Sequence, residues 1–247
     1  MHRNTREWNH DFLEIFLLFC LLLVLHSTTP CPAQDLAGPS PQGENGLSRH
    51  PWQVGVFAQG GFPPSYEVRS SGSFIHYGVQ LELFSAGFAA GIQTRRFDGP
   101  RPLRGRGEAL LEVVPFWLAR YPPQTLVTYE GPYVVTGTWN GQNTPGASVT
   151  PFLLRWNFSQ RDSARVVPWL QLGGGLLWTN HKFPLAYGNT SVINFTPQAG
   201  VGISVFNRPR HSMDFAIKAV HISNANLGDF DPGIFTMQFS AGYSWWK

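Results

Sequence analysis

The sequence contains little cysteine and little charge for its length. Its 247 residues include two cysteines, Cys20 and Cys31, and 13% of the residues are charged. Both cysteines lie in an N-terminal segment that we expect to be removed. The mature chain would then have no cysteine, which excludes a disulfide scaffold, a thiolate metal site and a cysteine nucleophile.

Long hydrophobic runs are also scarce, since only the stretch from Ile15 to Leu25 is continuously apolar. Together with a mean hydropathy of −0.13, this excludes a polytopic helical membrane protein. A disordered protein is excluded by the hydrophobic content of 43% and the aromatic content of 14%. Two classes remain, a soluble β protein and a membrane β-barrel, whose strands accommodate apolar residues by alternation.

The N-terminal segment has the layout of a secretory signal peptide. Two arginines precede the apolar run, and small and polar residues follow it up to Ala33. The apolar core is too short to span a bilayer comfortably. We therefore expect a cleaved signal peptide over residues 1–33, a flexible lead-in rich in Pro, Gly and Ser over 34–51, and one barrel domain over 52–247. The alternatives are an uncleaved signal anchor and a lipid-modified Cys31.

The rest of the chain alternates between apolar and polar residues over segments of about ten residues, the length that a tilted strand needs to cross a membrane. The alternation is clearest over 192–206, where Ile193, Phe195 and Val201 share one face. Similar patterns mark the segments at about 52–61, 74–94, 105–121, 148–158, 166–179, 211–224 and 236–245. The sequence therefore predicts an all-β fold, an eight-stranded antiparallel transmembrane β-barrel of the outer-membrane type, in which closure leaves no exposed edge.

Charged residues within these segments predict which face points inward. They lie on the face opposite the apolar set of their strands, so we expect pairing inside a narrow lumen among Glu108, Glu112, Arg155, Asp214 and Lys218. Alternation alone does not separate inside from outside, so a water-soluble β-sandwich or a lipocalin-like barrel is the alternative. The long strands, the secretory signal and the cysteine-free mature chain favour the membrane.

One stretch differs from the rest in its chemistry. His221 and Ser223 lie two residues apart on a predicted strand and share its apolar face, which in a membrane barrel faces lipid. A histidine and a serine at the end of an apolar stripe find little water there. Two interpretations of these residues are open. They are either a polar fringe where the strand leaves the bilayer, which would be structural, or a reactive pair, which would be functional.

The run His221-Ile222-Ser223-Asn224-Ala225, followed by Pro232-Gly233-Ile234, resembles the lipid A 3-O-deacylase family. The segment from Leu153 to Phe158 and the run Gly173-Gly174-Gly175 add to the resemblance. The resemblance implies a serine esterase that removes the acyl chain ester-linked at position 3 of lipid A, with its active site on the outside of the barrel. It implies lipid A or lipopolysaccharide as the partner, no nucleic acid, and export to the cell outer membrane; formation of a homodimer stays open.

By the same resemblance, Ser223 would be the nucleophile and His221 the base that takes its proton. Two side chains on one strand face lie about 7 Å apart along the strand, so Oγ and an imidazole nitrogen can come within hydrogen-bond reach. Asn224 and the backbone N–H groups of the following loop would stabilise the oxyanion. Strict alternation points Asn224 toward the lumen, so holding the loop is its alternative role.

The sequence departs from the family at the third member of the site. The family places a carboxylate on the last strand, where this chain has Phe235. A hairpin that turns near Gly228 would bring Phe235 opposite His221, but phenylalanine accepts no hydrogen bond. We expect Asp231, or else Asp229, to orient the imidazole, since loss of an orienting acid can cost about four orders of magnitude in rate. The alternative function is a catalytically silent barrel, structural or lipid-binding, that has lost the acid.

A basic loop is the remaining candidate for a binding site. The sequence pI is about 9.0, and arginines crowd one predicted loop between the second and third strands. Arg101, Arg104 and Arg106 are candidates for contacts with the lipid A phosphates, because guanidinium groups pair well with phosphate. A solvated turn, or a rim facing any anionic lipid, is the alternative. His181 and His211 have no metal-ligand spacing with other donors, so we predict neither a metal site nor a cofactor.

Overall fold

A computed structural model describes residues 52–63, 68–70, 73–75, 80–100, 103–130, 133–159, 164–184, 190–229, 231 and 233–247. The predicted signal peptide over 1–33 and the lead-in over 34–51 lie outside these residues. Helices that could span a membrane are absent from the described part of the chain.

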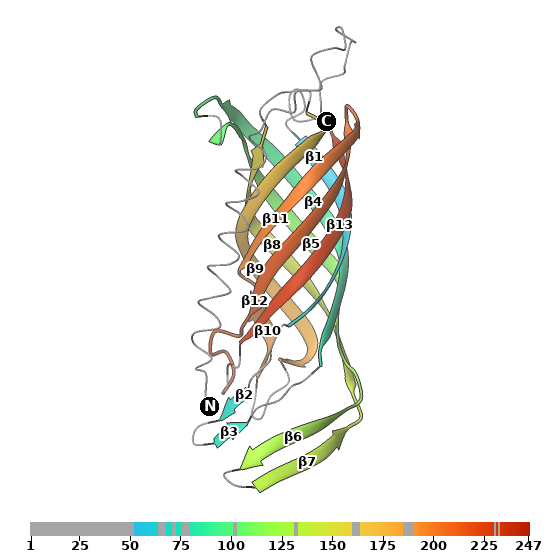
Figure 1. Ribbon diagram of the computed structural model, residues 1–247, viewed down its shortest axis with the longest axis vertical. Coiled ribbons are helices and arrows are strands. Elements are labelled where there is room, and N and C mark those ends of the chain that lie inside the picture. The colour runs from blue at the N-terminus through green and yellow to red at the C-terminus, as the bar shows by residue number, and fades with distance from the viewer. Residues whose placement is uncertain are drawn as a thin grey trace, which may run out of the picture.

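Eight long antiparallel strands form a closed barrel (Figure 1). They are β1 (Trp52–Phe62), β4 (Glu82–Phe97), β5 (Gly105–Tyr121), β8 (Gln142–Phe158), β9 (Val166–Phe183), β11 (Gln198–Arg208), β12 (His211–Ile222) and β13 (Ile234–Trp246). Each strand pairs with the next of this series, and β13 pairs with β1 to close the barrel. The predicted fold class is confirmed.

The strand predicted over 192–206 is interrupted. The short β10 (Ser191–Phe195) pairs with β9, and Thr196 and Pro197 separate it from β11. Proline has no N–H to donate to a ladder, which accounts for a break at this point. On its other side, β10 reaches the end of β12 through an isolated bridge between Phe195 and Ser223.

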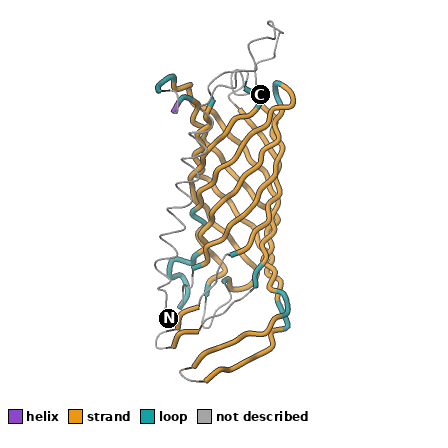
Figure 2. The backbone as a smooth tube through the Cα atoms, in the orientation of Figure 1, coloured by secondary structure: helices purple, strands orange, loops and turns teal. Residues whose placement is uncertain are grey.

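Two other segments differ from the prediction. The strand expected over 74–94 begins only at Glu82, and β3 (Ser73–Ile75) pairs instead with β2 (Val68–Ser70). A hairpin formed by β6 (Gln124–Glu130) and β7 (Tyr133–Trp139) was not predicted from the sequence. This hairpin projects from the barrel end opposite the C-terminus, as Figure 2 shows. It therefore adds to a loop and leaves the barrel at eight strands.

The outer wall of the barrel is apolar. On β1, Trp52 and Val54 are 58% and 56% exposed, whereas Gln53 between them is buried. The same alternation continues around the wall, with Phe152 and Leu154 of β8 among the most exposed side chains. An apolar exterior around a polar interior is the pattern of a barrel in hydrocarbon. The soluble alternative, with its apolar faces turned inward, is wrong.

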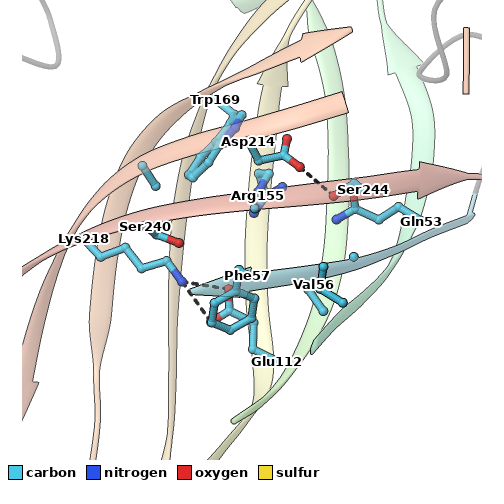
Figure 3. Close-up of a pocket in the computed structure, with 14 residues that line it drawn as sticks. Gln53, Val56, Phe57, Glu112, Arg155, Trp169, Asp214, Lys218, Ser240 and Ser244 are labelled. Carbon is cyan, nitrogen blue, oxygen red and sulfur yellow. Dashed lines mark hydrogen bonds and ion pairs between the residues drawn. The ribbon is translucent and has the colours of Figure 1, made fainter. Parts of the chain in front are cut away.

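The lumen holds the paired charges that the sequence predicted (Figure 3). Lys218 Nζ lies 2.9 Å from a carboxylate oxygen of Glu112, and the Arg155 guanidinium lies 3.9 Å from Glu108. Asp214 accepts hydrogen bonds from serines of neighbouring strands. Buried charges are tolerated when they are paired and hydrogen-bonded, so this network is compatible with a narrow, polar barrel interior.

The two ends of the barrel differ. At the terminus end, β1 and the C-terminus meet, since the Trp52 N–H donates to the Lys247 carbonyl at 3.0 Å. At the opposite end, which we call the loop end, β12 stops at Ile222 and the longer connections begin. A buried apolar cluster that includes Trp117, Phe183, Ile222 and Ile234 fills the lumen there. This packing fixes the wall segment on which His221 and Ser223 lie.

Candidate active site

His221 and Ser223 lie at the loop end, on the outer wall of the barrel. His221 is exposed and Ser223 is half-buried, while Ile222 between them is buried in the lumen. The strand thus turns the histidine and the serine toward one outward face, as the alternation predicted. Phe195 and Phe235, which flank them on neighbouring strands, are 40% and 37% exposed. The pair therefore lies within an apolar surface.

Backbone hydrogen bonds hold both residues against β10 and β11. The His221 N–H donates to the Pro197 carbonyl at 3.0 Å. The Ser223 N–H donates to the Phe195 carbonyl at 3.1 Å, and the Phe195 N–H donates to the Ser223 carbonyl at 2.7 Å. A reactive side chain keeps its geometry best when rigid elements support it. Ser223 has such support although it lies just past the end of β12.

On its other side, His221 faces Phe235 of β13, as predicted from the expected hairpin. The His221 peptide N–H points toward β11, so His221 and Phe235 form a non-hydrogen-bonded pair. In such pairs the Cα atoms lie about 4.5 Å apart and the side chains are closest. The predicted juxtaposition is therefore confirmed, and a phenyl ring occupies the position from which an acid could orient the imidazole.

The imidazole of His221 lies against Gly233. A Cβ atom placed on Gly233 would lie 3.0 Å from Cε1 and 3.4 Å from Nε2 of the ring. The register pairs Ile222 with Ile234, and its continuation sets Gly233 level with Ser223. The ring therefore leans along the strand toward the serine. Within the described residues, no hydrogen bond joins the two side chains, and catalytic contacts of this kind often tighten only when substrate is bound.

Asn224 organises the loop that follows Ser223. Its side chain is fully buried, and its Oδ1 accepts a hydrogen bond from the Asn226 N–H at 2.9 Å. Its carbonyl accepts the Leu227 N–H at 3.0 Å. Ala225 and Asn226 have positive φ values of 50° and 63°, so the chain makes a tight left-handed turn here. These contacts favour the loop-holding role of Asn224 over a direct contact with substrate.

Asp231 holds the same loop from its far side. Its Oδ1 accepts the backbone N–H of Asn224 at 3.1 Å. Asp231 is half-buried and lies two residues before Gly233, which contacts the imidazole, whereas Asp229 is exposed. Among the described residues, no hydrogen bond joins Asp231 to His221.

The predicted phosphate arginines do not belong to this site. Arg104 and Arg106 lie at the β4–β5 turn, at the terminus end, whereas Ser223 lies at the loop end. The ends of β12 alone are on the order of 40 Å apart along the strand, at about 3.4 Å per residue. Arg104 lies instead 4.0 Å from Asp98, and Arg101 is outside the described residues. The prediction that Arg104 and Arg106 bind the phosphates of a lipid A molecule at Ser223 is therefore wrong.

Two residues of the site were not predicted from the sequence. Gly233 was noticed only as part of a Pro-Gly-Ile run, and its contact with the imidazole depends on strand register. Phe195 forms the bridge to Ser223 across a break in its strand. Its outward facing was visible in the alternation, but its partner was not. In the described part of the chain, no group of three His, Cys, Asp or Glu side chains could hold a metal ion.

The fold and the site together define a class of protein. The chain is a transmembrane β-barrel of the outer-membrane type whose lipid-facing wall carries a histidine and a serine side by side on one strand end. The family model "Lipid A 3-O-deacylase (PagL)" matches residues 112–244, more than half of the chain. The chain therefore belongs to the lipid A 3-O-deacylase family, which confirms the resemblance noted in the sequence.

The chain was also compared with solved structures. The crystal structure of the outer membrane enzyme PagL is 16% identical, with a TM-score of 0.43 over 78% of this chain and 99% of that chain. Neisserial surface protein A (NspA) is 15% identical, with a TM-score of 0.43 over 79% of this chain and 97% of that chain. The β domain of the Bordetella autotransporter BrkA is 14% identical, with a TM-score of 0.25 over 79% and 98%. No curated protein sequence matches the chain.

Proposed function

We propose that this protein is an outer-membrane serine esterase that removes the ester-linked 3-O-acyl chain of lipid A. The observation that carries the proposal is the lipid-facing pair of His221 and Ser223, in a chain of the lipid A 3-O-deacylase family. An ester at the boundary between head group and acyl chains could reach these side chains without leaving the bilayer.

The position of the pair along the barrel supports this substrate. In barrels of the outer membrane, short turns face the periplasm and longer loops face the exterior. The β11–β12 turn at the terminus end is tight, since only residues 209 and 210 separate Arg208 from His211, whereas the β5–β8 connection at the loop end includes a whole hairpin. His221 and Ser223 would then lie at the level of the outer leaflet, where lipid A resides.

Catalysis would follow the serine esterase pathway. His221 takes the hydroxyl proton of Ser223 as Oγ attacks the ester carbonyl carbon. Collapse of the tetrahedral intermediate breaks the bond to the sugar oxygen, which leaves with the proton from His221. Water activated by His221 then adds to the acyl-serine, releases the fatty acid and restores Ser223.

A backbone N–H is the best candidate to stabilise the oxyanion. The N–H groups of Ser223, Asn224, Asn226 and Leu227 are engaged with other acceptors. That of Ala225, two residues after the nucleophile, has no acceptor among the described residues. A preorganised donor of this kind can contribute about 10²- to 10³-fold to kcat.

Asp231 is our candidate for the acid. It lies on the segment that leads to Gly233, and its Oδ1 already fixes the loop through Asn224. Approach of the carboxylate to the imidazole would supply the acceptor that Phe235 lacks.

The second candidate function is a catalytically silent barrel, and the apolar residue opposite His221 is the observation that favours it.

Labelling with a fluorophosphonate probe separates the two functions. An activated serine reacts with such a probe, so we expect wild-type barrel to be labelled at Ser223 and a His221→Ala variant to be labelled far less. Ser191→Ala is the matched control, because Ser191 is another half-buried serine near the loop end. Failure of the folded wild-type barrel to label would favour the silent barrel.

A further inference from the structure

The arginines that the proposed active site does not use form part of a larger basic surface. Cations lie on the three turns at the terminus end, which join β4 to β5, β8 to β9 and β11 to β12, and on the C-terminus. We call these residues the basic rim: Arg104, Arg106, Arg165, Arg208, Arg210 and Lys247. Because these connections follow one another around the barrel, the positive charge encircles this end.

Within the described residues, most of the rim has no acid to pair with. Arg165, Arg208, Arg210 and Lys247 are exposed, and within the described residues no Asp or Glu side chain lies within ion-pair distance of them. Among the described residues, Asp98 is the acid found near the rim, 4.0 Å from Arg104. The exposed guanidinium groups of Arg165, Arg208 and Arg210 produce a strong local positive potential and suit an anionic partner with phosphate oxygens.

The loop end offers a contrast among its described residues. Arg120 lies 3.5 Å from Glu82 there. Among the described residues, the exposed Arg165, Arg208 and Arg210 of the rim therefore differ from Arg120, which lies beside an acid.

The position of the rim relative to the membrane indicates which anionic group it meets. Trp52, Trp245 and Phe97 are 58%, 44% and 46% exposed on the outer wall next to these turns. Outward aromatic side chains of this kind mark the boundary between acyl chains and head groups. The rim, which lies just beyond them, is thus at the level of the lipid phosphates.

The rim is also a rigid platform. The Arg165 carbonyl accepts the Phe206 N–H at 2.7 Å, and the Arg210 carbonyl accepts the Trp246 N–H at 2.9 Å. The turns that carry these arginines are thus tied to neighbouring strands, which lowers the entropy lost when a head group binds.

We propose that the basic rim binds the phosphate head groups of anionic glycerophospholipids in the leaflet at the terminus end. This interaction is independent of the esterase site, which lies in the opposite leaflet. It would hold the barrel at a fixed depth and give it an annulus enriched in acidic phospholipid. Lipid binding at the rim also gives a role to Arg104 and Arg106, which lie too far from Ser223 to contact a substrate there.

The test is lipid selectivity measured by electron spin resonance. The folded barrel is placed in phosphatidylcholine vesicles with trace spin-labelled phosphatidylglycerol or phosphatidylcholine, and the ratio of the two association constants is determined. One surface cation contributes about 1 kcal/mol of attraction to acidic lipid, or about five-fold in association. We expect the variant Arg165→Gln with Arg208→Gln and Arg210→Gln to lose at least five-fold of the wild-type ratio.

The control is Arg120→Gln with Lys182→Gln, which removes cations from the loop end. It should keep the wild-type ratio, and heat-modifiable gel mobility confirms that each variant is folded. A wild-type ratio near one, or an equal loss in rim and control variants, would overturn the proposal. Loss of selectivity on addition of inorganic phosphate at constant ionic strength would assign the rim to free phosphate and would equally overturn it.

Discussion

Replacing Phe235 by glutamate tests whether a carboxylate on β13 orients His221 better than Asp231, whose Oδ1 accepts the Asn224 N–H. Phe235 faces His221 in a non-hydrogen-bonded pair, so a carboxylate there would lie beside the imidazole. Loss of an orienting acid costs up to about 10⁴-fold in related hydrolases, and we expect Phe235→Glu to raise kcat by about 10- to 10³-fold. The barrel should still fold, since Phe235 is at a strand end, where an acidic residue costs about 0–1 kcal/mol.

The assay is release of fatty acid from purified lipid A in detergent, measured at saturating substrate. Phe235→Gln is the matched control, because it supplies an acceptor of the same size without the charge, and its gain should be smaller. Phe235→Glu combined with His221→Ala should show no gain, because the glutamate acts through the histidine. An unchanged kcat in folded Phe235→Glu protein would refute the reasoning, since Asp231 would then already orient His221 as well as a glutamate at position 235 does.

Three further predictions concern other contacts. Gly233→Ala forces the imidazole aside and strains a backbone with a φ of +54°. We therefore expect steady-state kinetics to show kcat lowered about 10- to 100-fold with KM little changed. Asp231→Asn keeps an acceptor for the Asn224 N–H but removes the charge, so thermal stability should hold while kcat falls; an unchanged kcat would exclude Asp231 as the acid. Lys218→Met leaves a buried, unpaired Glu112 and should destabilise the barrel by about 3–5 kcal/mol in urea unfolding, and a second change, Glu112→Leu, should restore most of it.

The fold could be predicted from the sequence because, in a membrane barrel, lipid-facing apolar residues alternate regularly with lumen-facing polar or small residues. Residues such as Ile193 and Phe195 face lipid, so the two-residue period of the strands is visible in the sequence. The lumen pairs followed for the same reason, since a charge opposite an apolar stripe has only the interior to occupy. The β6–β7 hairpin was missed although its residues are β-branched and aromatic, because a hairpin outside the bilayer need not show strict alternation.

The site could be predicted only in part. The shared outward face of His221 and Ser223 follows from a spacing of two residues. The contact between His221 and Gly233, and the bridge between Ser223 and Phe195, depend on the register between strands, which a single sequence does not encode locally. The arginine assignment failed for a related reason: the order of strands and turns decides which end of the barrel a loop occupies, and Arg104 is at the end away from Ser223.

The central claim is that Ser223 hydrolyses the 3-O-acyl ester of lipid A. It is tested most directly by mass spectrometry of lipid A from outer membranes that contain the wild-type chain, a Ser223→Ala chain or neither. We expect loss of one ester-linked acyl chain only with the wild-type chain. Identical lipid A in all three membranes, with both barrels folded, would contradict it.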